Sequence, residues 1–204
     1  RDIFSDPPVS IKKIIKQTHI ETLSIIPSDI RLERIAQFLY MRPKREEILQ
    51  RALQPIYNDF DFFVIDCPPS LGLLTVNAMS AANSVLIPIQ CDYYALEGLS
   101  QLVNTINLVK ENINTALEIE GVLLTMADYR TNLTNEVIDE VKKFFNQKVY
   151  STVIPRNIRL AEAPGFGKPI AIYDKNSIAA KKYEDFANEI LGVKKDTIAE
   201  IGKN

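Results

Sequence analysis

The feature that most constrains the fold is a short apolar run that ends at a carboxylate and two prolines. The run spans residues 62–65, and Asp66, Cys67, Pro68 and Pro69 follow it. Aromatic and β-branched residues without polar alternation predict a strand buried on both faces of a parallel sheet. Each proline fixes φ and removes an amide donor, so the chain leaves this strand in a rigid turn. The pattern therefore predicts an acid at the carboxyl edge of a sheet.

Short apolar runs of this kind alternate with longer helical patterns along the chain. Strands joined by helices imply right-handed crossovers and parallel pairing. The predicted fold class is α/β, a doubly wound and mostly parallel sheet with helices on both faces. Strands are predicted at residues 23–27, 62–66, 84–89, 119–126, 149–154 and 170–172, and helices at 8–17, 28–41, 43–58, 73–82, 95–112, 132–145 and 177–191.

The composition fits one core without an overall electrostatic bias. A chain of 204 residues with 46% hydrophobic content can bury one sizeable core. We expect a single domain over residues 1–191 and a short polar tail at 192–204. The 24 basic and 26 acidic side chains leave a net charge of -2. Binding to nucleic acid or to a membrane surface would therefore require a local patch.

Cysteine use and hydropathy favour a cytoplasmic protein. Cys67 and Cys91 are too few for a disulfide framework, which indicates a reducing compartment. No apolar run approaches the length of a membrane span, and the first residues lack the apolar core of a signal peptide. An iron–sulfur site on these two cysteines is disfavoured, because a buried cysteine commonly behaves as a small apolar residue.

The acid at the end of the predicted strand points to nucleotide chemistry. P-loop nucleotide hydrolases place the Walker B aspartate at such a position, where it polarises a water on the Mg²⁺ between the β and γ phosphates. The alternative for Asp66 is a strand-terminating acid that caps the following turn. The flanking pattern favours the magnesium role, although the chain has no G-x-x-x-x-G-K-[ST] segment to hold the phosphates.

Four blocks of sequence, in order, resemble the ParA/Soj family of partition ATPases. They are DCPPSLGLLT at 66–75, PIQCDYYALEGL at 88–99, EGVLLTM at 120–126 and VIPRNIRL at 153–160. Family members begin with a strand, a P-loop carrying an extra lysine and a second acidic motif, none of which occurs here. The resemblance therefore implies a chain that is truncated before Arg1 and lacks a first βαβ region. Such a chain is expected to hydrolyse ATP poorly or not at all by itself.

The resemblance assigns a nucleotide role to seven residues. Asp66 would hold Mg²⁺ through water, and the turn of Pro68 and Pro69 would act as a switch that senses the γ phosphate. The remaining residues would lie on the adenine side of ATP: Met126, Pro155, Arg156 and Asn157. The charge of Arg156 leaves a second possibility open, a contact to phosphate or DNA.

Two arginines match family positions that contact DNA without regard to sequence. They are Arg130, in the loop after the strand predicted at 119–126, and Arg159, after the turn at 155–157. Non-specific binding needs only a few cations on phosphates, doubled by dimerisation, so the near-neutral net charge is compatible with it. The alternative is that both are merely solvated surface arginines.

The resemblance implies a partition protein that segregates chromosomal or plasmid DNA in the cytoplasm, on the nucleoid. It would bind ATP and Mg²⁺ as a sandwich homodimer, bind non-specific double-stranded DNA and work with a ParB-type partner. One alternative is a non-catalytic remnant or interaction module without a P-loop. A MinD-like membrane-surface ATPase is disfavoured because residues 194–201 mix both charges. An ATP-dependent ligase of cofactor synthesis is the third alternative, for which no substrate motif is found.

Overall fold

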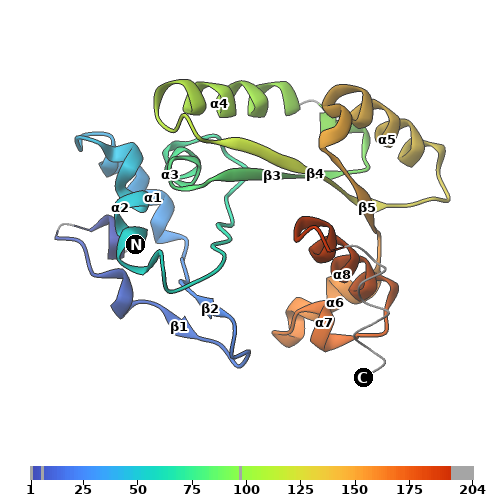
Figure 1. The fold of residues 1–204 in the computed structure, drawn as a ribbon, viewed down its shortest axis with the longest axis horizontal. Helices are drawn as coiled ribbons and strands as arrows, with labels where there is room; N and C mark the ends of the chain where they lie inside the picture. Colours follow the sequence, from blue (N-terminus) through green and yellow to red (C-terminus); the bar gives the residue numbers. More distant parts are fainter. Residues whose placement is uncertain (1, 6, 97, 194–204) are drawn as a thin grey trace. The chain divides into compact units, whose positions relative to one another are not determined.

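The chain forms two compact units in the computed structural model, which describes residues 2–5, 7–96 and 98–193 (Figure 1). Unit 1 comprises residues 1–85 and 101–118, and unit 2 comprises residues 86–100 and 119–204. The prediction of a single domain over 1–191 stays a prediction. From residue 194 onward, the tail predicted at 192–204 lies outside the described residues.

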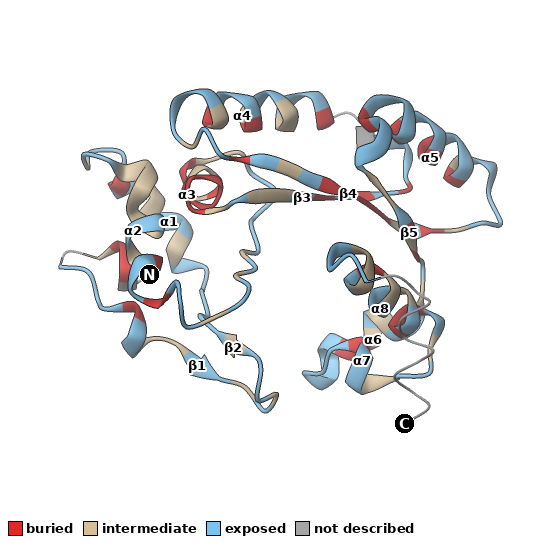
Figure 2. Ribbon diagram, viewed as in Figure 1, coloured by how far each residue is buried: buried red, intermediate tan, exposed pale blue. Residues whose placement is uncertain are grey.

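Unit 1 is mainly helical. One apolar core cluster among its described residues includes the buried side chains of Phe4, Leu39 and Ile56. Helix α3 is buried at seven of its nine positions, and Figure 2 shows it almost entirely in the colour of buried residues. The elements are the 3-10 helices η1 (Asp2–Phe4), η2 (Ile11–Lys13), η3 (Arg45–Glu47) and η4 (Gln54–Ile56), the helices α1 (Arg31–Leu39), α2 (Ile48–Leu53), α3 (Leu73–Ala81) and α4 (Leu99–Asn112), and the antiparallel pair β1 (Lys16–Gln17) and β2 (Ser24–Ile25).

Unit 2 contains a sheet with strand order β3-β4-β5. Strands β4 and β5 are parallel. The Glu118 amide at the start of β4 donates to the Asn83 carbonyl just before β3, and the Cys91 amide just after β3 donates to the Thr125 carbonyl near the end of β4. Like ends are thus joined to like ends, so β3 and β4 also run in the same direction. The elements are β3 (Ser84–Gln90), β4 (Glu118–Ala127), β5 (Val149–Pro155), the 3-10 helices η5 (Tyr93–Leu96), η6 (Asn146–Lys148) and η7 (Ala163–Phe166), and the helices α5 (Asn132–Phe145), α6 (Ile158–Glu162), α7 (Ile170–Tyr173) and α8 (Ile178–Ile190).

Helices α5 and α8 lie on opposite sides of β5 (Figure 1). The apolar stripe of α5 is buried at Val137 and Val141. From α8, Phe186 packs edge-on against Tyr150 of β5, with ring centroids 5.0 Å apart. Ser177 caps α8 by accepting a hydrogen bond from the Ala180 amide. These contacts confirm the predicted class, an α/β fold with a parallel sheet flanked by helices.

The prediction of a strand at 62–66 was wrong. The segment is extended, but no described residue pairs with its backbone as a neighbouring strand. Phe63 and Ile65 pack against the core of unit 1, whereas the side chains of Phe62 and Val64 are 67% and 95% exposed. An apolar run is buried on both faces only when strands on each side take its hydrogen bonds.

Three other predictions at the sequence level need correction. Residues 8–17 form only the short turn η2 before β1, and the strand predicted at 23–27 shrinks to β2. Residues 170–172 are helical, because the chain turns after Pro169 and the Asp174 amide donates to the Ile170 carbonyl. Helices α6 and η7 were not predicted.

Candidate functional site: an arginine-lined cavity beyond β4 and β5

The register of two parallel strands brings the candidate residues of unit 2 together. Ala127, the last residue of β4, lies opposite Pro155, the last residue of β5. The Arg156 amide then donates to the Ala127 carbonyl at 3.0 Å, which holds the two departing loops side by side. Parallel sheets bind ligands beyond the carboxyl ends of their strands, so this is where a site is expected.

Met126 has an unusual backbone at this edge. Its φ is +53°, a value that residues other than glycine adopt rarely. The pairing of β4 with β5 shifts register between Leu124 and Ala127, so Met126 lies in a β-bulge. Bulges redirect a side chain, and the side chain of Met126 is 47% exposed although it belongs to a strand with a largely buried centre. Backbone strain of this kind is concentrated at ligand sites.

The two loops line an open cavity of about 570 Å³. That volume lies within the range of small-molecule sites, roughly 300–1,000 Å³. All of its lining residues belong to unit 2. They are Ala127, Asp128, Tyr129, Arg130, Arg156, Asn157 and Ile158. Three residues predicted from the sequence, Arg130, Arg156 and Asn157, therefore share one cavity.

Asp128 organises the loop between β4 and α5. Its amide donates to Thr134 Oγ1 at 3.1 Å, and its carbonyl accepts from the hydroxyls of Thr131 and Thr134. Its carboxylate accepts from Arg130 three times: from the amide at 3.1 Å, from Nε at 2.8 Å and from Nη2 at 2.5 Å. The loop thus presents Arg130 as one half of a bidentate ion pair.

The ion pair controls the ionisation of both partners. Hydrogen bonds from the Arg130 guanidinium lower the pKa of Asp128 to about 2, with a smaller contribution from the charge of Arg156. The same hydrogen bonds raise the pKa of Arg130. Asp128 is the anchored partner, with its side chain 22% exposed, whereas that of Arg130 is 86% exposed.

Arg159 lies in a second network, at the start of α6. Its amide donates to the N-cap side chain of Asn157 at 2.8 Å. Its Nη1 donates to Glu162 Oε2 at 2.9 Å, and its Nε lies 3.6 Å from Asp174 Oδ2. The hydroxyl of Tyr173 also donates to Glu162 Oε2, at 3.1 Å. These bonds, the one from Arg159 first, lower the pKa of Glu162.

Arg156 differs from the other two arginines. Its residue is exposed, and no acidic side chain among the described residues lies within ion-pair distance of its guanidinium. Its charge is nevertheless close enough to Asp128 to contribute to the lowered pKa of that carboxyl. Arg156 is thus the cavity cation without a described counter-ion.

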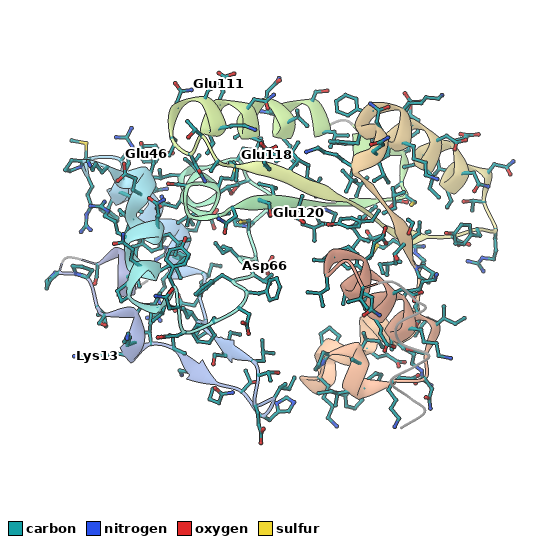
Figure 3. All side chains as sticks on the ribbon, in the orientation of Figure 1. Lys13, Glu46, Asp66, Glu111, Glu118 and Glu120 are labelled. Carbon is teal, nitrogen blue, oxygen red and sulfur yellow. The ribbon has the colours of Figure 1, made fainter. Side chains whose placement is uncertain are left out.

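The other predicted site residues belong to unit 1. Asp66, labelled in Figure 3, lies on the extended stretch that precedes α3. Asp66, Pro68 and Pro69 are all exposed. Among the described residues, no group of three or more His, Cys, Asp or Glu side chains could hold a metal ion.

Four cavity residues escaped the sequence analysis: Ala127, Asp128, Tyr129 and Ile158. Each is a near neighbour in sequence of a residue that had been identified, and Asp128 and Tyr129 come just after the strand predicted at 119–126. Their position just after predicted parallel strands could have identified them as candidate site residues. The ion pair of Asp128 with Arg130 could not have been predicted, because it depends on how the loop folds onto Thr134.

Comparisons with known proteins identify the family. A family model described as an AAA domain matches residues 3–119. The sporulation initiation inhibitor protein Soj of Bacillus subtilis is 57% identical over 189 residues, which are 93% of this chain and 74% of that protein.

Two solved structures share the fold. Cobyrinic acid a,c-diamide synthase from Mycobacterium smegmatis, with a bound ATP analog and magnesium, has a TM-score of 0.71 at 32% identity and covers 82% of this chain and 72% of its own. The ATP complex of McdA from Cyanothece has a TM-score of 0.83 at 20% identity, over 95% of this chain and 75% of its own. The fold is that of the P-loop nucleotide hydrolases, and the chain belongs to the Soj/ParA family of chromosome partitioning proteins.

Proposed function

We propose that the protein is a ParA/Soj-type partition ATPase that binds ATP with Mg²⁺ and non-specific double-stranded DNA. The observation that carries the proposal is a cavity beyond β4 and β5 that Arg130, Arg156 and Asn157 line together. The identity of 57% with Soj is well above the 32% shared with the cobyrinic acid enzyme, which favours partition over ligation.

The cavity fits the base of a nucleotide. It offers an amide side chain at Asn157, an aromatic ring at Tyr129 and apolar surface at Ile158. Pro155, which pairs with Ala127, and Met126, in the bulge just before Ala127, flank it. A mostly apolar wall with a few oriented polar groups is what recognises a heterocycle. We assign Met126, Pro155, Arg156 and Asn157 to the adenine side on this basis.

Asp66 and its turn would serve the phosphate end of ATP. Bound ATP supplies the phosphate oxygens that Mg²⁺ prefers, and Asp66 would orient a water on that ion. The chain bends at Pro69 and Ser70, and Thr75 Oγ1 of α3 donates to the Ser70 carbonyl. A rigid segment joined to α3 in this way is suited to transmit the phosphate state to that helix.

Arg130 and Arg159 would contact the DNA backbone. Both side chains are more than half exposed, at 86% and 55%. An arginine fork matches the geometry of a phosphate and carries no sequence information. A homodimer would double these contacts, and the adjacent exposed rings of Tyr93 and Tyr94 are suitable anchors for a second subunit. A ParB-type protein would be the partner that stimulates hydrolysis.

One alternative keeps specific support. The unpaired, apolar segment at 62–66 would also suit an interaction module that docks on another protein. The MinD-like alternative depends on residues 194–201, which lie outside the described residues. Among the helices of the described part of the chain, none has the length and apolar character to cross a membrane.

The test is DNA binding by the full gene product with ATP and Mg²⁺, measured by fluorescence anisotropy on a random duplex. The R130E/R159E double variant is expected to lose DNA binding while retaining nucleotide binding. The matched control is K142E/K143E, which makes the same charge change near the other end of α5, about 18 Å along the helix. Equal DNA binding by wild type and R130E/R159E would contradict the proposal.

A further inference from the structure

The two proposed DNA-contact arginines share a feature that the function does not require. Each guanidinium is already held by carboxylates of the same unit, Arg130 by Asp128 and Arg159 by Glu162. Asp128 occupies Nε and Nη2 of Arg130, one of the two edges through which a guanidinium makes a bidentate contact with phosphate. A phosphate at this edge competes with the carboxylate for both donors, and a phosphate at the other edge, Nη1 and Nη2, competes for Nη2.

In each pair the carboxylate is the anchored partner. Asp128 is fixed because its backbone bonds to Thr131 and Thr134. Glu162 accepts from the hydroxyl of Tyr173, and the Tyr173 ring stacks on Phe166 with centroids 5.0 Å apart. The arginine side chains are the exposed ends. On contact with phosphate the arginine would move while the carboxylate stays in place.

We propose that Asp128 and Glu162 are built-in competitors of the DNA phosphates, and that they set the affinity for DNA below the level that the arginines alone would allow. The inference rests on the proposed function of Arg130 and Arg159. Each ion pair has little net charge, which lowers the attraction to DNA until the pair opens. Arg156, without a described counter-ion, remains the permanent cation beside the pair at Asp128.

The competition has a functional consequence. A partition protein must release DNA as well as hold it, and an internal carboxylate shortens the time for which each arginine stays on a phosphate. The carboxylate takes back the guanidinium as soon as the phosphate leaves. Affinity changes among related complexes arise mostly in the dissociation rate. Removal of either carboxylate should therefore slow dissociation from DNA more than it accelerates association.

The test compares D128N and E162Q with wild type in the full gene product, on a random duplex at one salt concentration with ATP and Mg²⁺. The amide variants keep an oxygen that can accept from the arginine but lack the charge. Each is expected to bind DNA about three- to tenfold more tightly. The control is E140Q, which removes the same charge from the exposed pair of Glu140 and Lys143 on α5 and is expected to change affinity less than twofold.

A double-mutant cycle identifies the cause. When D128N is introduced into R130A, DNA affinity should rise no more than it does on introducing E140Q into wild type. The reason is that Asp128 no longer has an arginine partner for which it competes with phosphate. The inference is overturned if D128N and E162Q bind DNA more weakly than wild type, or if their affinity changes only as much as that of E140Q. In that case the proposed function still stands, provided that R130E/R159E fails to bind DNA. DNA binding by R130E/R159E at the wild-type level, or by no variant at all, overturns both. Thermal melting of each variant separates these results from misfolding.

Discussion

The ring of Tyr150 on β5 lies directly over the α-carbon of Gly121 on β4. A Cβ at Gly121 would come within 2.4 Å of Tyr150 Cε2 and 3.0 Å of the Lys148 carbonyl oxygen. The Tyr150 ring cannot simply move away, because Phe186 packs against it. The absence of a side chain at Gly121 is thus a packing requirement where β4, β5 and α8 meet.

Replacing this glycine should destabilise unit 2. We expect G121A to lower the free energy of unfolding by about 1–3 kcal/mol, as overpacking typically does. G165A is the control, since a Cβ there would meet nothing within 4 Å. Urea denaturation monitored by circular dichroism measures both. Equal stability of G121A and G165A would show that the Tyr150 ring can shift to accommodate the added methyl group without loss of stability.

Glu189 accepts hydrogen bonds from two backbone amides of β5. Its Oε1 accepts from the Ser151 amide at 2.6 Å and its Oε2 from the Thr152 amide at 3.0 Å. Burial alone would raise the pKa of Glu189, but these hydrogen bonds outweigh it and lower the pKa. The stabilisation is thus present above the ordinary glutamate pKa and is lost as the pH falls through the lowered value.

Two measurements check this role. E189A should lower the unfolding free energy by about 1–3 kcal/mol at pH 7, because two amides lose a charged acceptor. Between pH 6 and 3 the difference between wild type and E189A should shrink. E184Q, at an exposed position on the same helix, serves as the control. A pH-independent difference would mean that side-chain packing, rather than charge, accounts for the loss.

Asn77 joins α3 to α2 within unit 1. The residue is fully buried; its Oδ1 accepts from the Leu49 amide, and its Nδ2 donates to the carbonyls of Arg45 and Leu73. N77A should cost about 2–4 kcal/mol, since it leaves buried backbone groups without partners. N112A removes a bond at an exposed position and should cost less than about 0.5 kcal/mol. Similar melting temperatures for the two variants would contradict this account.

The ion pair of Asp128 should be insensitive to pH across the useful range. Because hydrogen bonds from Arg130 hold the pKa of Asp128 at about 2, the carboxylate stays charged down to pH 4. The ratio of the DNA dissociation constants of wild type and D128N should therefore be constant from pH 8 to pH 6. On DNA, where Arg130 has moved to a phosphate, Asp128 lacks these hydrogen bonds, so the ratio should fall towards one only below about pH 5. A ratio that already changes between pH 8 and pH 6 would contradict this account.

The sequence predicted those elements whose buried face is determined by their own residue pattern. Helices α5 and α8 carry a full apolar stripe, and α8 also begins at a capping serine, Ser177. The parallel order of β4 and β5 likewise followed from the alternation of strands and helices, whereas the grouping of Met126 with Pro155 and Arg156 came from the family resemblance. The strand prediction at 62–66 failed because the apolar content of a segment does not determine whether neighbouring strands are present to pair with it.

The charge pairing within the site could not be predicted in the same way. Asp128 and Arg130 are two residues apart, and nothing in that spacing alone predicts a bidentate ion pair. They meet because the loop turns back on the Thr134 hydroxyl. Arg159 meets Asp174 only because η7 and α7 fold back towards α6, and the sequence had indicated a strand there.

The salt dependence of DNA binding tests the central claim most directly. With ATP and Mg²⁺ present, log K should fall linearly with log salt concentration, with the same slope on unrelated duplexes. R130A and R159A should each reduce the slope by about two per dimer, because each variant lacks one phosphate-binding cation on each of the two subunits. A flat response, or a slope unchanged when both arginines are removed, would contradict the claim that these side chains bind the DNA backbone.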